Sequence, residues 1–184
     1  MTFFKNAHRE LSDKELWERF LEGDIQVLEI IFNNHFKKLF RYGMTLFPDE
    51  AIVKDCIQVL FIELWSKKDQ LSSIEQLQPY LYKSLRNRIY NQYKSKKRYD
   101  ELIKDLKVER LIGINSEETN DVDTSNLQTL VNDLPMRQRE AIMLIFFEGH
   151  TYESASDILS INIQSLYTLV SRAVGSLRSN LRKN

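Results

Sequence analysis

The sequence predicts an all-α protein made of two small helical domains joined by a flexible acidic linker, and three observations support this prediction. The 184 residues contain only five glycines and three prolines, which favours long helices with few tight turns. Apolar residues recur every three or four positions through most of the chain. Residues 113–126 have almost no apolar content and carry several acids, so we expect the domain boundary there.

The first two helices are indicated by caps and by apolar periodicity. Ser12 and Glu15 have the spacing of a capping box, which predicts a short helix that ends near Leu21. A long helix is expected over residues 25–47, where the apolar positions recur at helical spacing, and Pro48 ends it.

The third helix, expected over residues 49–67 with Asp49 as its N-cap, has two distinct faces. One face is apolar and suits a core. The other mixes polar and large apolar side chains, and we call it the docking stripe: Asp55, Gln58, Phe61, Ile62 and Trp65. A surface stripe that contains Phe and Trp often marks a partner interface, whereas the alternative is that Phe61 and Trp65 are simply core residues of a broadly buried helix.

A basic helix follows a polar connection at residues 66–78, and Pro79 is expected as its first residue. Between Leu81 and Arg98 lie seven basic residues and no acid, although the formal net charge of the chain is zero. One face carries the apolar residues Leu81, Leu85 and Ile89. Another carries Lys83, Arg86, Tyr90, Lys94 and Lys97. Cationic side chains bind phosphates, and aromatic rings stack on unpaired bases. This combination favours nucleic-acid binding over the alternative of a solvated amphipathic helix.

The second domain is expected to be compact and helical. A short amphipathic helix is predicted over residues 127–134, and a longer one runs from Pro135 to about Glu148, with Gly149 as its C-cap. The helical pattern of the first domain continues to about residue 112 before the linker begins.

The last two helices have the spacing of a helix-turn-helix. A helix from Thr151 to Leu159 is joined by Ser160-Ile161-Asn162 to a final basic helix at 163–181. The alternative is an ordinary helical hairpin. The polar side chains at the start of the last helix favour DNA recognition, because they are what it would offer to a major groove: Gln164, Ser165, Tyr167, Thr168, Ser171 and Arg172.

Other classes of protein are poorly supported. His8, His35 and His150 lie on different expected elements, Cys56 has no histidine near it in sequence, and no Gly-rich phosphate loop or metal-ligand cluster occurs. We therefore expect no enzyme activity, no cofactor, no metal and no small-molecule substrate. The apolar runs are far shorter than a membrane span and the N-terminus lacks signal-peptide features, so we expect a cytoplasmic protein without membrane insertion.

Motifs in both halves occur in a characteristic order. In the first half they are Asp55-x-Ile57-Gln58-x-x-Phe61-x-x-Leu64-Trp65, then Tyr80-Leu81-Tyr82 and Arg86-Asn87. In the second half they are Leu134-Pro135-x-Arg137-x-Arg139, Thr151-Tyr152, Leu159-x-Ile161 and Arg172-Ala173-x-x-x-Leu177-Arg178. With these motifs the chain, from about Glu15 to Arg182, resembles a bacterial RNA polymerase sigma factor of the extracytoplasmic-function group.

The resemblance implies a promoter-specificity subunit that binds core RNA polymerase and is not itself an enzyme. Residues 1–112 would form a region 2-like domain, with its main part at about 12–98, and residues 127–184 a region 4-like domain. The docking stripe would bind the clamp helices of the largest polymerase subunit, and the second domain would lie near the flap of the second subunit. An anti-sigma factor is also implied as a partner.

The resemblance also implies which residues contact promoter DNA. The basic helix would recognise and help to melt the minus-ten element through Tyr82, Lys83, Arg86, Asn87, Tyr90, Lys94 and Lys97. The connection at 66–78 would capture a flipped base. The minus-thirty-five element would be read by Thr151, Gln164, Ser165, Tyr167, Thr168, Ser171 and Arg172.

The sequence departs from the family at three places. Ser154-Ala155-Ser156 replaces the usual Glu-Ile-Ala, Ser160 replaces a glycine in the turn, and Asn91 replaces an aspartate. The promoter sequences of relatives are therefore not carried over. The alternative function is a helix-turn-helix transcriptional regulator that is not a polymerase subunit. The docking stripe beside a basic helix favours a sigma factor, since a repressor needs neither.

Overall fold

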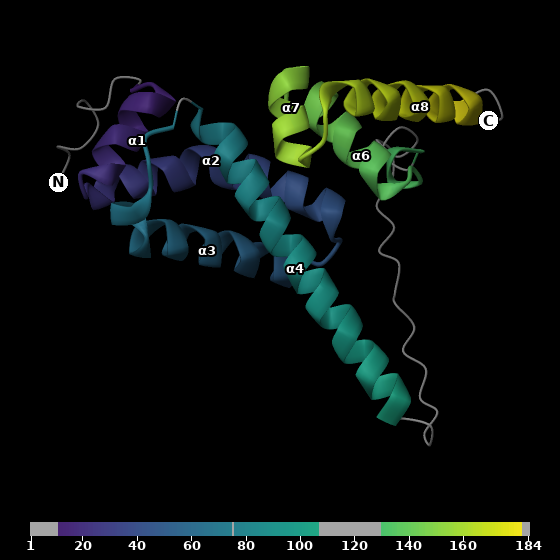
Figure 1. Ribbon diagram of the computed structural model, residues 1–184, viewed down its shortest axis with the longest axis horizontal. Coiled ribbons are helices and arrows are strands. Elements are labelled where there is room, and N and C mark those ends of the chain that lie inside the picture. Colours follow the sequence, from purple (N-terminus) through teal and green to yellow (C-terminus); the bar gives the residue numbers. More distant parts are fainter. Residues whose placement is uncertain (1–10, 75, 107–129, 182–184) are drawn as a thin grey trace, which may run out of the picture.

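The computed structural model describes residues 11–74, 76–106 and 130–181, and the regular structure in these ranges is entirely helical (Figure 1). The all-α prediction is therefore confirmed. The acidic linker, the continuation of the helix over 107–112 and the start of the helix expected at 127 lie outside the described residues. No helix in the described ranges has both the length and the apolar character that crossing a bilayer requires.

The first domain begins with short and long helices whose predicted caps are confirmed. Its elements are α1 (Asp13–Leu21), α2 (Ile25–Leu46), α3 (Glu50–Ser66), the 3₁₀ turn η1 (Lys68–Gln70) and α4 (Leu77–Leu106). The Ser12 and Glu15 side chains form the capping box at α1. The Asp49 carboxylate accepts a hydrogen bond from the Ile52 N–H at 3.1 Å, which caps α3.

Helix α4 crosses the bundle, and its C-terminal end projects beyond the other helices (Figure 1). Leu81, Leu85 and Ile89 are 1% exposed or less, so the predicted apolar face of this helix is confirmed. The prediction for Pro79 was wrong by two positions, because α4 begins at Leu77. Pro79 still lies in the first turn of α4. Backbone N–H groups in the first turn have no acceptor within the helix, so the missing N–H of proline costs no hydrogen bond there.

The second domain contains the predicted helix-turn-helix. Its elements, after a helical turn at 130–132, are α6 (Met136–Ile142), the π-helical turn η2 (Met143–Phe147), α7 (Tyr152–Leu159) and α8 (Ile163–Leu181). Thr151 caps α7, and the Asn162 side chain accepts from the Ser165 N–H at 2.7 Å at the start of α8. Ser160 adopts the left-handed conformation in the turn, with φ of 54°.

One difference from the expected elements lies before the helix-turn-helix. The helix predicted from Pro135 to Glu148 is α-helical only as far as Ile142 and then widens into η2. The Glu148 N–H donates to the Met143 carbonyl at 2.9 Å, which is the i→i+5 bond of a π-turn. Gly149 follows with φ of 72° and ends the segment as predicted.

The two domains pack directly against each other. Helix α7 contacts α4, and α6 contacts α2, which places the second domain along one side of the first (Figure 1). A single apolar cluster includes Leu81 and Leu85 from the first domain and Leu144, Ile158 and Leu166 from the second. The core is therefore continuous across the boundary between the two domains.

Candidate nucleic-acid and polymerase interfaces

The docking stripe on α3 is partly exposed. Asp55 and Gln58 are exposed, and Ile62 is 65% exposed, which is unusual for an isoleucine. The Trp65 ring is half-buried, and the ammonium group of Lys68 lies 5.6 Å from its centroid. The exposed apolar surface of the stripe is therefore supplied mainly by Ile62, with a smaller contribution from the half-buried Trp65.

Phe61 does not lie on the surface as the docking stripe required. Its side chain is 6% exposed, and its ring packs edge-on against Phe32 with centroids 5.0 Å apart. The alternative reading of Phe61 as a core residue is therefore the correct one. Buried residues on α3 also include Val53 and Ile57, so its buried face is wider than the spacing suggested.

A groove of about 520 Å³ lies between α3, the following connection and α4. The polar side chains on its α4 side include Asn87 and Asn91, and Tyr80 also lines it. The guanidinium of Arg88, also on α4, bonds the Glu63 carboxylate of α3 at 2.6 Å, and this contact lowers the pKa of Glu63 below its ordinary value. Amides both donate and accept hydrogen bonds, so the groove can bind the edge of a base.

The predicted minus-ten residues on α4 are divided between two environments. Lys83, Asn87 and Lys94 are exposed, whereas Tyr82 is fully buried. Lys97 lies on α4, but its side chain is outside the described residues. The remaining two, Arg86 and Tyr90, contact the second domain.

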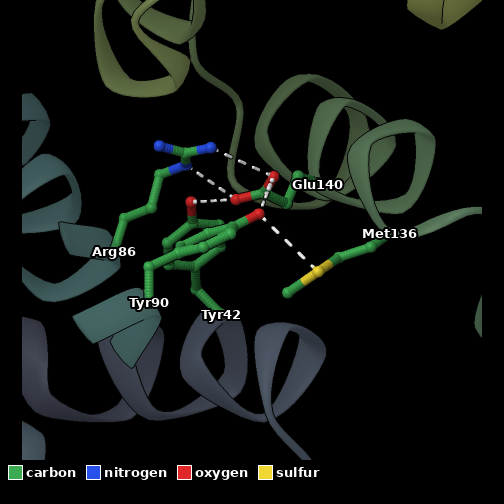
Figure 2. A network of polar contacts seen from close by, with 5 residues as sticks. All are labelled: Tyr42, Arg86, Tyr90, Met136 and Glu140. Atoms are coloured by element: carbon green, nitrogen blue, oxygen red, sulfur yellow. Dashed lines mark hydrogen bonds and ion pairs between the residues drawn. The ribbon is translucent and has the colours of Figure 1, made fainter. Parts of the chain in front are cut away.

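Glu140 of α6 is the acceptor for these two side chains, as Figure 2 shows. Its carboxylate is 0% exposed and bonds Arg86 Nε at 2.8 Å, the Tyr90 hydroxyl at 3.1 Å and the Tyr42 hydroxyl at 3.3 Å. Although burial lowers the pKa of Arg86, the charge of Glu140 raises it above its ordinary value. Burial and the same carboxylate raise the pKa of Tyr90.

A second carboxylate, Glu148, contacts the first domain in a similar way. Its side chain is 0% exposed and pairs with Arg41 of α2 at 2.7 Å. The Tyr82 hydroxyl donates to it at 2.7 Å, and burial together with this bond raises the pKa of Tyr82. The Tyr82 ring also lies edge-on to the His150 ring, with centroids 4.8 Å apart. Sequence reasoning missed Glu140 and Glu148, because neither belongs to a local motif.

The start of the last helix presents its side chains to solvent as predicted. Exposed residues on this face are Gln164, Ser165, Tyr167, Thr168, Ser171 and Arg172, and Thr151 of the preceding cap is exposed as well. The Tyr167 ring stacks on the Tyr152 ring, with centroids 4.4 Å apart and planes at 19°. Tyr152, which the sequence did not single out as a site residue, therefore holds Tyr167 in place.

Comparison with known proteins matches both halves of the chain. The sigma-70 region 2 family matches residues 31–99, and the sigma-70 region 4 family matches residues 124–177. The chain is a sigma factor of the extracytoplasmic-function type. It directs promoter-specific initiation of transcription by RNA polymerase and is not an enzyme. An ordinary helix-turn-helix regulator is set aside, because the sigma-70 region 2 family matches residues 31–99, which form most of the first domain.

Two curated relatives are similar to this sigma factor along most of their length. It is 24% identical over 156 residues to RNA polymerase sigma factor SigZ of Bacillus subtilis (strain 168), covering 84% of this chain and 86% of that protein. It is 22% identical over 178 residues to RNA polymerase sigma factor NccH of Alcaligenes xylosoxydans xylosoxydans, covering 94% of this chain and 96% of that protein.

Solved structures are similar in fold. The sigma factor RpoE of Bartonella quintana, crystallised with the anti-sigma factor NepR, matches with a TM-score of 0.67 and 25% identity, covering 86% of this chain and 98% of that one. CnrH in complex with the cytosolic domain of CnrY matches with a TM-score of 0.68 and 16% identity, covering 94% of this chain and 98% of that one.

Proposed function

We propose that this sigma factor melts the minus-ten element with α4 and captures a flipped base in the groove between α3 and α4. The groove carries the proposal, because it combines amide groups at Asn87 and Asn91 with the ring of Tyr80. An unstacked base needs hydrogen bonds to its edge and a ring to stack on. Lys83 and Lys94, exposed on the same helix, would hold the phosphates.

The second domain would read the minus-thirty-five element with the exposed face at the start of α8. This is supported by the capped helix-turn-helix and by a row of hydrogen-bonding side chains with no apolar cover. Gln164 and Ser165 lie nearest the N-terminus of α8, the end that helix-turn-helix proteins bring to the base edges. Arg172, about two turns further along α8, would contact a phosphate.

Two surfaces would contact core polymerase. Asp55, Gln58, Ile62 and Trp65 would bind the clamp helices of the largest subunit, with Phe61 supporting them from the core. The second domain would lie near the flap of the second subunit. These roles divide the chain into a region 2-like part at 1–112, a linker at 113–126 and a region 4-like part at 127–184.

An anti-sigma factor is proposed as a further partner. The similar sigma factor RpoE was solved in complex with the anti-sigma factor NepR, and the similar CnrH was solved in complex with the cytosolic domain of CnrY. The site of action would be the cytoplasm, where core polymerase and promoter DNA are found.

In vitro transcription with core polymerase on a promoter pool tests the proposal. Asn87→Ala should reduce open complexes on the selected promoter by about 5-fold to 150-fold, as expected for the loss of about 1–3 kcal/mol of base discrimination. Asn34→Ala, an exposed asparagine on α2, is the matched control. Equal effects of the two changes would argue against the groove.

Separate variants test the other two surfaces. Gln164→Ala should shift preference at particular upstream base pairs, whereas Ser179→Ala at the exposed far end of α8 should not.

Asp55→Ala and Ile62→Ala should weaken copurification with core polymerase, and Glu29→Ala on α2 is the control. Unchanged polymerase binding in both docking variants would remove α3 from the interface.

A further inference from the structure

The exposed face at the start of α8 contains an apolar surface among its polar side chains. Tyr167 is 47% exposed, and it lies between Gln164 and Ser171, which are three positions before it and four after it on the same face. Ile163, one turn nearer the N-terminus of the helix, is 36% exposed. The amide and hydroxyl groups of this face can bond base edges, whereas the ring of Tyr167 needs an apolar contact.

The Tyr167 ring is held in one orientation by the neighbouring helix. Helix α7 packs against α8 (Figure 1), and its first residue, Tyr152, stacks on the Tyr167 ring with centroids 4.4 Å apart and planes at 19°. This stack covers one face of the Tyr167 ring, while 47% of the residue stays open to solvent. The ring is thus positioned before DNA arrives, so binding costs little of its rotamer freedom.

A polar side chain that can read a base lies close to this ring. Gln164 carries an amide, the group that bonds adenine through its N6 and N7 atoms. Three residues along a helix span about 4.5 Å, and successive base pairs are about 3.4 Å apart. With Gln164 on one base pair, Tyr167 would therefore lie near an adjacent one.

The major groove offers one apolar group to such a ring. Its base edges present hydrogen-bond donors and acceptors together with the C5 methyl group of thymine. Cytosine carries a hydrogen atom at that position, and both purines present an N7 acceptor to the groove instead. A ring with one covered face and an open remainder therefore matches thymine and gains no comparable contact from the other three bases.

We propose that Tyr167 recognises the C5 methyl group of one thymine in the minus-thirty-five element, and that Tyr152 is the positioning residue that holds its ring. The contact is apolar, so it selects thymine over cytosine without a hydrogen bond to the base. This inference rests on the proposed role of α8 in reading the minus-thirty-five element, and it names the base that one of its side chains selects.

Replacement of thymine by uracil tests the proposal with the parent protein, because uracil keeps the base pair and lacks only the methyl group. Each thymine of the minus-thirty-five element, on either strand of a selected promoter, is replaced in turn, and the affinity of the holoenzyme is measured. At one position the affinity should fall about fourfold, as expected for the loss of one buried methyl group. Equal affinity for thymine and uracil at every position would overturn the proposal.

Protein variants assign the methyl contact to the stacked pair. Tyr167→Ala should remove the difference between thymine and uracil at that position, whereas Tyr167→Phe should keep it, because the ring rather than the hydroxyl makes the contact. Tyr152→Ala should reduce the difference, and Tyr152→Phe should retain it. Tyr93→Ala, which removes an equally exposed tyrosine from α4, is the matched control and should leave the difference unchanged.

The remaining outcomes separate this inference from the proposed role of α8. A difference between thymine and uracil that persists in Tyr167→Ala would overturn the assignment to Tyr167. Its loss in Tyr167→Phe would show that the hydroxyl makes the contact, which also overturns the proposal. Gln164→Ala without effect at any upstream base pair would instead count against base reading by α8. The uracil series and the two phenylalanine variants remain decisive if circular dichroism shows that an alanine variant is unfolded.

Discussion

At the scale of single residues, the turn of the helix-turn-helix contains a conformational cost. Ser160 has φ of 54°, a region that side chains with a Cβ atom adopt at a cost of about 1–2 kcal/mol. The sequence showed Ser160 where the family usually has glycine, and the structure shows that the backbone still adopts the glycine-like conformation. The short connection between α7 and α8 therefore overrides the preference of the residue.

Ser160→Gly should raise the free energy of unfolding by roughly 0.5–1 kcal/mol, because relief of this strain exceeds the greater entropy of glycine in the unfolded chain. Ser160→Val should lower it, since a β-branched residue tolerates positive φ poorly. Urea unfolding followed by circular dichroism measures both changes. A lower stability for the glycine variant would contradict strain at this position.

His35 is a second residue whose surroundings have a measurable consequence. It is buried, and desolvation lowers its pKa, while Asp13 at 3.9 Å opposes this shift and Lys38 adds to it. Because the unfolded chain then binds more protons than the folded chain near the ordinary histidine pKa of about 6.5, stability rises with pH in this range.

The free energy of unfolding should therefore fall as pH decreases from about 7 to 5, through the ordinary histidine pKa of about 6.5. His35→Leu should make this fall shallower, and His150, whose pKa is also lowered by burial, should account for part of the remaining slope. Urea unfolding at several pH values measures the slope. Equal slopes for the parent and the variant would exclude His35 as a cause.

At the scale of elements, the packing of α2 on α3 depends on a glycine. A Cβ atom added at Gly43 would lie 2.5 Å from Val53 Cγ1 and 3.3 Å from Ile89 Cδ1, so the helices meet where a side chain would not fit. Gly175 of α8 has no atom within 4 Å of such a Cβ position. Gly43 and Gly175 both lie within helices of the described residues, so they can be compared directly.

Gly43→Ala should lower the free energy of unfolding by about 1–3 kcal/mol through overpacking. Gly175→Ala should raise it by about 0.5–1 kcal/mol, because alanine restricts the unfolded chain and the site has room for it. Thermal or urea unfolding of the two variants gives the comparison. Stabilisation by alanine at both positions would show that the α2–α3 contact can relax.

At the scale of the whole molecule, net charge is zero but the basic residues are concentrated on α4. Lys94 and Lys97 lie towards its projecting end, past the groove residues Asn87 and Asn91. Charges at this end are suited to hold the DNA backbone without reading its sequence. Their loss should therefore weaken promoter complexes in general.

Lys94→Ala together with Lys97→Ala should reduce the slope of log affinity against log salt by about 0.9 for each lost phosphate contact. The measurement is holoenzyme binding to several promoters at different salt concentrations, and Lys37→Ala on α2 is the matched control. A loss confined to one promoter position would instead assign base recognition to these lysines.

The sequence by itself determined the helices, their caps, the helix-turn-helix and the family. Each of these depends on neighbours within a few residues, as the Ser12–Glu15 box and the Asn162 cap illustrate. Local spacing also correctly predicted which side chains of α8 are exposed. It was wrong for Phe61, because the buried face of α3 is set by packing against α2 rather than by the period of one helix.

Only the tertiary structure decided how the two domains meet. Glu140 is 54 residues from Arg86 in sequence, and Glu148 is 66 residues from Tyr82, so no periodicity could connect them. Glu140 lies on α6 and Glu148 directly follows η2, and neither position is marked out by its neighbours in sequence. Their burial follows from the way α6, η2 and α7 pack on α2 and α4, since a carboxylate removed from water is stable only where other elements supply its hydrogen bonds.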